Sequence, residues 1–100
     1  MPRDVVSQLR ARVPEHVVHR DFQEETVVLN LENGQYHGLN ATARRMLAAL
    51  VEADSIALAA AALEGEFGVS RVRIERDLVD LCDALVARGL LEFDEAQAAA

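Results

Sequence analysis

The first part of the chain contains three extended segments, and the second and third lie on either side of an Asn-Gly dipeptide. The first, the stretch 15–21, contains two adjacent β-branched residues and predicts a short strand. In the next segment apolar residues recur with a period of two and resume after the dipeptide, at Val27, Leu29, Leu31, Tyr36 and Leu39. Because both central residues of a type I′ turn need positive φ, Asn-Gly between extended runs predicts a β-hairpin.

This hairpin implies a definite strand register. With Asn33 and Gly34 as the two turn residues, Leu31 pairs with Tyr36 and the remaining pairs follow from it. Val27, Leu29, Leu31 and Tyr36 then lie on one face of the sheet. We expect that face to pack against the helices.

A helical period replaces the alternation after the hairpin and predicts three helices. Apolar residues three and four apart run from Met46 to Val51, from Ile56 to Phe67 and from Ile74 to Leu85. Capping and stop residues bound these runs: Asn40 or Thr42 before the first, Asp54-Ser55 and Gly65 or Gly68 around the second, and Ser70 and Gly89 around the third.

The order of these elements predicts one α+β domain over residues 15–93, in which a three-stranded antiparallel sheet is followed by three helices. A chain of 100 residues has room for a single core, and 17 of its 51 hydrophobic residues are alanines, so that core is modest. Residues 1–14 are expected to form a flexible arm, with a short frayed helix through Val5, Leu9 and Val13 as the alternative. Residues 94–100 are expected to be a disordered tail.

The third predicted helix carries more apolar surface than one core contact needs. On a helical wheel its core stripe lies within about 40° of Ile74. A second apolar group lies beside that stripe, at Val72, Val79, Cys82 and Val86. Either this group packs on the sheet, or it lines a groove beside the strand 35–39, which we expect to be an edge of the sheet.

Such a groove would suit an extended peptide that adds a strand to the sheet edge and buries its apolar side chains against the helix. The residues that we expect to contact such a peptide come from the edge strand and from the facing side of the helix. They are Gln35, Tyr36, His37, Gly38, Leu39, Val72, Glu75, Arg76, Val79, Cys82, Asp83 and Val86.

The charge balance argues against nucleic acid and anionic membranes as partners. Ten Lys and Arg residues stand against 17 Asp and Glu residues, which gives a net charge of −7, and the sequence pI is about 4.8. Affinity for a phosphate backbone rests largely on cationic side chains that displace counterions. With one cysteine, no signal-peptide pattern and no long apolar run, a cytoplasmic protein is expected.

The sequence offers no catalytic or metal-binding constellation. His16 and His19 are three apart on a predicted strand, so their side chains point to opposite faces and cannot chelate together. Cys82 lies inside a helix near Asp80 and Asp83, which disfavour its thiolate. We therefore expect a protein without catalytic activity, metal or cofactor.

The segment from Thr26 to Leu91 resembles the PqqD-like family, the small peptide-recognition domains of ribosomally made, modified peptides. The stretch VVLNLENGQYHGLN is similar to the family's hydrophobic strand, turn Gly, aromatic residue and Leu-Asn. The EFGV stretch and RIERDLVDLCDALVARGLL are similar to the end of its second helix and to its Asp-bearing third helix with a Gly-Leu-Leu close. The chain differs from the family at Ala43, where Gly is frequent, and at Met46-Leu47, where Trp is frequent.

The resemblance implies a winged helix-turn-helix-like fold and a non-catalytic protein. It implies that the leader segment of a precursor peptide binds as an added strand between the third strand and the third helix and is delivered to a modifying enzyme. The hairpin is most similar to that of the stand-alone domains of lasso-peptide clusters, whose partner is a separate leader peptidase. The alternatives are a pyrroloquinoline quinone pathway peptide chaperone that serves a radical S-adenosylmethionine enzyme, and a winged-helix DNA-binding regulator.

Overall fold

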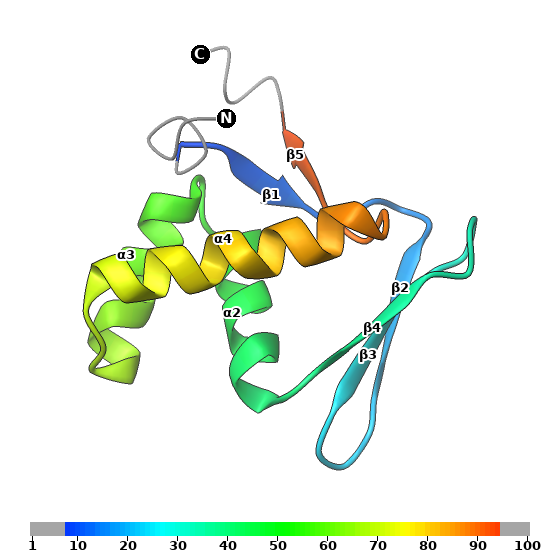
Figure 1. The fold of residues 1–100 in the computed structure, drawn as a ribbon, viewed down its shortest axis with the longest axis horizontal. Helices are drawn as coiled ribbons and strands as arrows, with labels where there is room; N and C mark the ends of the chain where they lie inside the picture. The colour runs from blue at the N-terminus through cyan, green and yellow to red at the C-terminus, as the bar shows by residue number, and fades with distance from the viewer. Residues whose placement is uncertain (1–7, 95–100) are drawn as a thin grey trace.

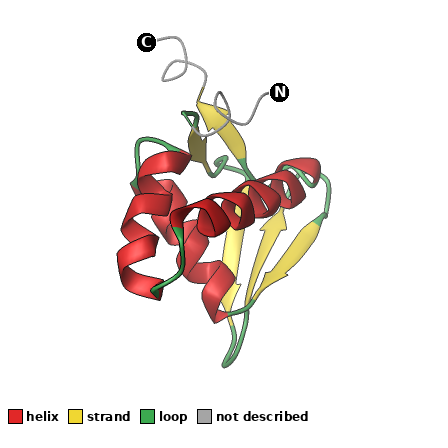
Figure 2. Ribbon diagram, turned by 60° about the vertical axis from the view of Figure 1, so that its left-hand side comes forward, coloured by secondary structure: helices red, strands yellow, loops and turns green. Residues whose placement is uncertain are grey.

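The computed structural model describes residues 8–94 and contains the predicted α+β arrangement. A three-stranded antiparallel sheet has the order β2 (Val17–Asp21), β3 (Thr26–Asn30) and β4 (Tyr36–Leu39). Three helices follow: α2 (Ala41–Glu52), α3 (Ile56–Phe67) and α4 (Arg71–Ala87). All three lie on one side of the sheet, and α4 passes across its strands (Figures 1 and 2). The predicted fold class is confirmed.

The hairpin forms, but its register differs from the expected one. Leu29, not Leu31, lies opposite Tyr36. The connection is longer because the Asn30 side chain folds the backbone back: its Oδ1 accepts hydrogen bonds from the N–H groups of Glu32 and Asn33 at 2.8 and 3.2 Å. The two-residue turn is therefore replaced by a loop that the Asn30 carboxamide organises.

The sheet face that packs on the helices is also the opposite of the expected one. Thr26, Val28 and Asn30 are buried, whereas Val27 and Leu29 are only half-buried. The two polar residues tolerate burial because each has a partner: Thr26 donates to Asp21 at 2.6 Å, and Asn30 bonds the end of α4. The apolar positions that the alternation assigned to the core therefore face outward.

The predicted helix ends are largely confirmed. The side chain of Asn40 accepts from Ala43 N at the start of α2, and that of Ser55 accepts from Leu58 N at the start of α3. The α3 helix ends at Gly68, which has φ +67°, and Gly89 follows α4 with φ +69°. Ser70 makes no side-chain cap; instead a carboxylate oxygen of Glu64 accepts from Arg71 N at 2.9 Å.

The expected arm is partly ordered. Residues 10–12 form β1 (Arg10–Arg12), which pairs antiparallel with β5 (Glu92–Asp94) in a separate two-stranded sheet. Leu9 and Ala11 are buried because this small sheet packs against α2. The prediction of a flexible arm is therefore wrong for residues 8–14, and that of a disordered tail is wrong for Asp94, which belongs to β5. Residues 1–7 and 95–100 lie outside the described residues.

The core lies among the three helices and the inner face of the sheet. In α4 it takes Ile74, Leu78, Cys82 and Leu85, so that Cys82 occupies the place expected for Leu81, which is half-buried. Within residues 8–94, the helices are all too short or too polar to cross a membrane.

Candidate peptide-binding site

The outer edge of β4 offers backbone hydrogen-bonding groups that the sheet does not use. Asn30 N donates to Gln35 O at 2.8 Å, and Val28 lies opposite His37. Because inward and outward groups alternate along a strand, Gln35 and His37 bond to β3, while Tyr36 and Gly38 point their N–H and C=O groups away from it. Within residues 8–94, no other strand pairs with this side of β4.

The end of α4 contacts the sheet at the hairpin between β3 and β4. At this end, Asn30 Nδ2 of β3 donates to the carbonyl oxygen of Gly89, which follows α4, at 2.9 Å. At the other end, where β4 leads into α2, a cavity of about 230 Å³ is shared by α2, α3 and α4. We call it the end pocket, and its lining residues are Thr42, Met46, Phe67, Val69, Arg73, Ile74 and Asp77.

The end pocket shows which side of α4 faces the start of α2, the helix that follows β4. Arg73 and Asp77 lie on this side, and helical spacing continues it through Leu81 and Ala84, both half-buried. We call these four residues the groove flank. At 100° per residue, the line Val72, Val79 and Val86 lies roughly 160° away from Asp77.

The predicted contacts on the edge strand lie together, as residues 35–39 do in sequence. Tyr36 is exposed on the outer face of the sheet, and His37 is half-buried on the helix-facing side. Leu39 is only 1% exposed and its side chain belongs to the core. Since it follows Gln35 and His37 in the alternation, its backbone groups also point toward β3, so Leu39 offers no free group to a bound peptide.

The predicted contacts on α4 need correction. Cys82 is completely buried, so its assignment to a groove wall is wrong. Val72, Val79 and Val86, with Glu75 next to them on the wheel, follow the flank that points away from the end pocket, and Arg76 and Asp83 lie between the two flanks. The groove flank, Arg73, Asp77, Leu81 and Ala84, was not among the predicted contacts; the position of Arg73 and Asp77 around the end pocket, with Thr42 and Met46, draws attention to it.

The site carries no evident reactive group. Burial, and to a lesser extent the charge of Asp83, raises the pKa of the Cys82 thiol to about 12. The thiol is therefore protonated at neutral pH as well as inaccessible. Within residues 8–94, no three His, Cys, Asp or Glu side chains are placed to hold a metal ion together.

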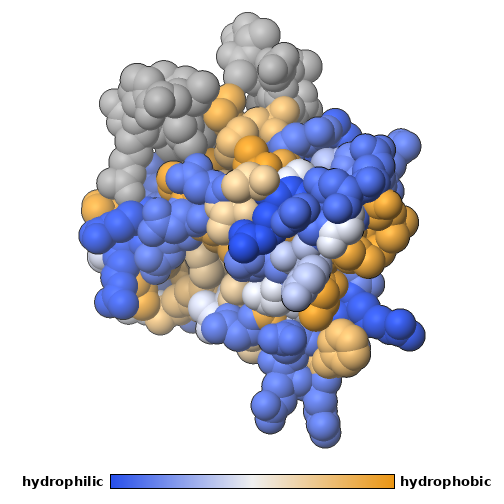
Figure 3. Space-filling model, turned by 45° about the vertical axis from the view of Figure 1, so that its right-hand side comes forward, coloured by the Kyte–Doolittle hydropathy of each residue, from blue (hydrophilic) through white to orange (hydrophobic). Residues whose placement is uncertain are grey.

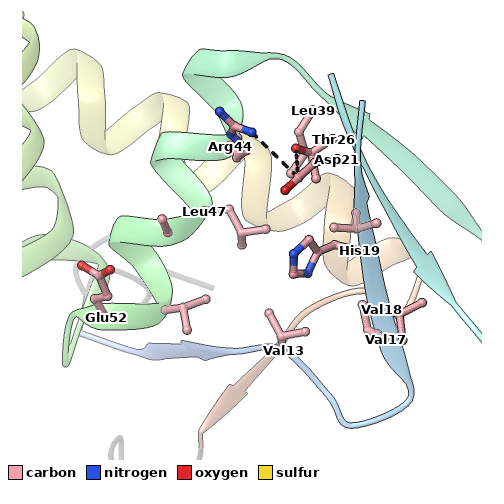
Figure 4. A pocket seen from close by; sticks show the side chains of 13 residues that line it. Val13, Val17, Val18, His19, Asp21, Thr26, Leu39, Arg44, Leu47 and Glu52 are labelled. Atoms are coloured by element: carbon pink, nitrogen blue, oxygen red, sulfur yellow. Dashed lines mark hydrogen bonds and ion pairs between the residues drawn. The ribbon is translucent and has the colours of Figure 1, made fainter. Parts of the chain in front are cut away.

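A second, larger cavity lies on the helix-facing side of the sheet, between β2 and α2. It measures about 400 Å³ and is lined mainly by aliphatic side chains, among them Val13, Val17, Leu47 and Val51. Figure 4 shows this cavity with Arg44 and Asp21 at one end, where Arg44 Nη1 lies 3.8 Å from Asp21 Oδ1. This cavity does not adjoin the outer edge of β4, and sequence reasoning did not anticipate it.

A known protein family matches the part of the chain that contains β3, β4 and the three helices. The family model described as coenzyme PQQ synthesis protein D (PqqD) matches residues 25–91, which run from the start of β3 to the end of the core. The chain belongs to the PqqD family. This PqqD match begins after β2, so β1, β2 and β5 lie outside it.

Solved structures extend the comparison beyond the PqqD segment. TbiB1 in complex with the TbiA(beta) leader peptide is 34% identical over 81% of this chain and 94% of that chain, with a TM-score of 0.71. Lasso peptide synthetase B1 complexed with the leader peptide is 28% identical over 83% of this chain and 98% of that chain, with a TM-score of 0.73. Among curated proteins no match was found.

Proposed function

We propose that this chain is a non-catalytic carrier that binds the leader segment of a ribosomally made precursor peptide and presents it to a separate leader peptidase. The supporting observation is the outer edge of β4, where Tyr36 and Gly38 point backbone groups away from β3 and no other strand of the described residues pairs with them. The similarity to two leader-peptide complexes points to the same kind of ligand.

In this proposal the leader lies antiparallel or parallel to β4 and bonds Tyr36 and Gly38 through its main chain. Every second leader side chain then points toward the groove flank. An apolar leader residue enters the end pocket, where Met46, Phe67 and Val69 provide apolar contact. Asp77 and Arg73 at the same pocket can bond a polar tip on that residue.

Binding can be tested by fluorescence anisotropy with the labelled TbiA(beta) leader peptide as probe, because TbiB1 shares 34% of its aligned residues with this chain. The leader encoded with this chain's own precursor is the second probe, and labelled duplex DNA at about 0.1 M salt is the comparison. We expect saturable binding of a leader peptide and none of DNA. Tight DNA binding without peptide binding would favour the winged-helix regulator and contradict the proposal.

The absence of catalysis is tested separately. The purified chain, incubated overnight with its precursor peptide, is expected to leave the peptide mass unchanged, because Cys82 is buried and protonated. Mass spectrometry gives the answer. Cleavage that persists in Cys82→Ala would reveal another nucleophile, and cleavage that disappears in this variant would make Cys82 the nucleophile.

A further inference from the structure

The helices leave part of the helix-facing surface of the sheet uncovered at β2. Val28 of β3 is buried on that face, and His19 of β2 lies opposite Val28, so the His19 side chain points to the same side. His19 is nevertheless exposed, and so is Asp21 two positions further on. The α2 helix packs against β1 and β4. The space that remains between α2 and β2 is the cavity of about 400 Å³ described above, which we call the β2–α2 cavity.

The walls of the β2–α2 cavity are mainly aliphatic. On α2, Leu47, Ala48 and Val51 are spaced three and four apart and form one stripe along the cavity. Val17 of β2 and Val28 of β3 also line it. Figure 3, which turns the sheet side of the molecule forward, shows apolar residues interspersed with polar ones, as is usual for a protein surface. In the cavity apolar side chains converge instead, around a volume within the range of small-molecule sites, about 300–1,000 Å³.

Polar groups lie at one end of this cavity. Arg44 Nη1 is 3.8 Å from Asp21 Oδ1, which is longer than a hydrogen bond, whereas Thr26 Oγ1 donates to the same oxygen at 2.6 Å. Asp21 therefore has a donor of its own, and the guanidinium of Arg44 can donate to a further acceptor. The imidazole of His19 points into the cavity from β2 (Figure 4).

The opposite end of the cavity is negatively charged. Glu52 lines it eight residues after Arg44 on the same helix, which corresponds to about 12 Å along α2. An elongated molecule with an anionic head is therefore oriented with the head at Arg44 and away from Glu52. A carboxylate suits Arg44 best, because a guanidinium binds a carboxylate through two parallel hydrogen bonds.

We propose that the β2–α2 cavity binds a linear aliphatic monocarboxylate, with its carboxylate at Arg44 and its hydrocarbon chain between the α2 stripe and β2. Burial of each CH2 group against Leu47, Val51 and Val17 supplies the affinity. The proposed function does not require this site, because the cavity does not adjoin the outer edge of β4. Leader binding and acid binding are therefore separate properties of the chain.

The test is isothermal titration calorimetry of the full chain with sodium hexanoate, octanoate and decanoate, each below its critical micelle concentration. We expect one bound molecule per chain and an affinity that rises by up to about fourfold for each added CH2 group. Decylammonium carries the same hydrocarbon chain on a cationic head. It should bind at least about tenfold more weakly than decanoate.

Two variants, each with a matched control, locate the site. Ala48→Leu fills the cavity with another good helix former and should lower decanoate affinity at least about tenfold. Ala87→Leu makes the same change at an exposed position of α4 and should bind as wild type. Arg44→Gln removes the partner of the carboxylate and should also lower affinity at least about tenfold. Arg20→Gln removes the same charge from the opposite face of β2 and should leave affinity within about twofold of wild type.

The outcomes decide the proposal independently of leader binding. Absence of saturable decanoate binding to the wild-type chain overturns it, and full affinity in a folded Ala48→Leu places the acid elsewhere. Equal binding of decylammonium and decanoate contradicts the role of Arg44. Circular dichroism checks that each variant is folded and that decanoate leaves the fold intact; a loss of helical signal on adding decanoate would show binding to the unfolded chain and refute the site. If Ala48→Leu does not fold, Arg44→Gln and the chain-length series decide.

Discussion

Asn30 and Gly89 join the sheet to the end of α4. The Nδ2 group of Asn30 donates to the carbonyl oxygen of Gly89 at 2.9 Å, and a Cβ atom on Gly89 would lie only 2.6 Å from that nitrogen. Gly89 also has a φ of +69°, which side-chain-bearing residues rarely adopt. This contact holds the hairpin end of the sheet against the end of α4.

Gly89→Ala is therefore expected to destabilise the protein more than Gly68→Ala. Gly68 has nearly the same φ, +67°, but nothing lies within 4 Å of a Cβ added there. Gly68→Ala should cost about 1–2 kcal/mol for the left-handed backbone. Gly89→Ala should cost roughly a further 1 kcal/mol or more, because the Asn30 hydrogen bond must also yield. Urea denaturation of both variants measures the difference, and equal losses would contradict the role of the contact.

Gly38→Pro is expected to weaken leader binding at least tenfold while the domain stays folded, because proline removes an N–H group that points away from the sheet. Gly38→Ala is the matched control: it adds the same Cβ, whose closest neighbour is the flexible Glu25 carboxylate at 3.1 Å, but keeps the N–H. Anisotropy measures binding and circular dichroism measures folding. Equal binding by the two variants would exclude main-chain pairing at Gly38.

His37→Pro is expected to destabilise the fold more than Gly38→Pro, although both substitutions lie on β4. The N–H group of His37 points toward β3, so its loss removes a hydrogen bond of the existing sheet. We expect a lower midpoint of urea unfolding in His37→Pro than in Gly38→Pro. The reverse order would mean that the alternation of inward and outward groups along β4 is shifted by one residue.

A charge on each flank of α4 distinguishes the two sides of the helix. Ala84→Glu places a carboxylate on the groove flank, and we expect leader affinity to fall at least tenfold, or about 1.4 kcal/mol. Val72→Glu alters the opposite flank at a residue that is 68% exposed, and leader affinity should stay unchanged. Anisotropy with the same labelled leader compares the variants. Binding that is lost in Val72→Glu but kept in Ala84→Glu would restore the valine line as the groove wall.

The buried thiol predicts a loss of stability at high pH. The pKa of Cys82 is raised to about 12 in the folded protein, from an ordinary value of 9.0. Between these values the unfolded chain loses the proton and the folded chain keeps it. This contribution to stability is therefore complete below pH 9 and declines by about 1.4 kcal/mol per pH unit as the pH rises toward 12. The free energy of unfolding of wild type minus that of Cys82→Ala, measured by urea titration at several pH values, should show this slope; a flat difference would contradict it.

The features that could be predicted from sequence are local. Asn40, Ser55 and Gly68 bound their helices because a cap or a left-handed residue acts within one helical turn. The hairpin between β3 and β4 was found for a similar reason, since Asn33-Gly34 lies between two alternating runs.

The features that were missed depend on contacts between distant residues. The alternation favoured Val27 and Leu29 for the core. Asn30 is buried instead because it donates a hydrogen bond to Gly89, and this partner lies 59 positions away in the sequence, where a local pattern does not show it. The rotation of α4 about its axis is set in the same way. A helical wheel shows that Asp77 and Val79 lie on different flanks, but only the position of Asp77 around the end pocket, with Thr42 and Met46, shows which flank faces the start of α2.

The pairing of β1 with β5 brings the two places where the described fold begins and ends to adjacent positions, with Arg10 opposite Asp94 and an ion pair between Arg12 and Glu92. Both strands lie away from the loop that joins β2 to β3, which is at the bottom of Figure 1. A domain with neighbouring points of entry and exit can be inserted into a loop of another protein without forcing that loop apart. The fold is therefore suited to transplantation into a host enzyme as an internal module, with the outer edge of β4 left unpaired.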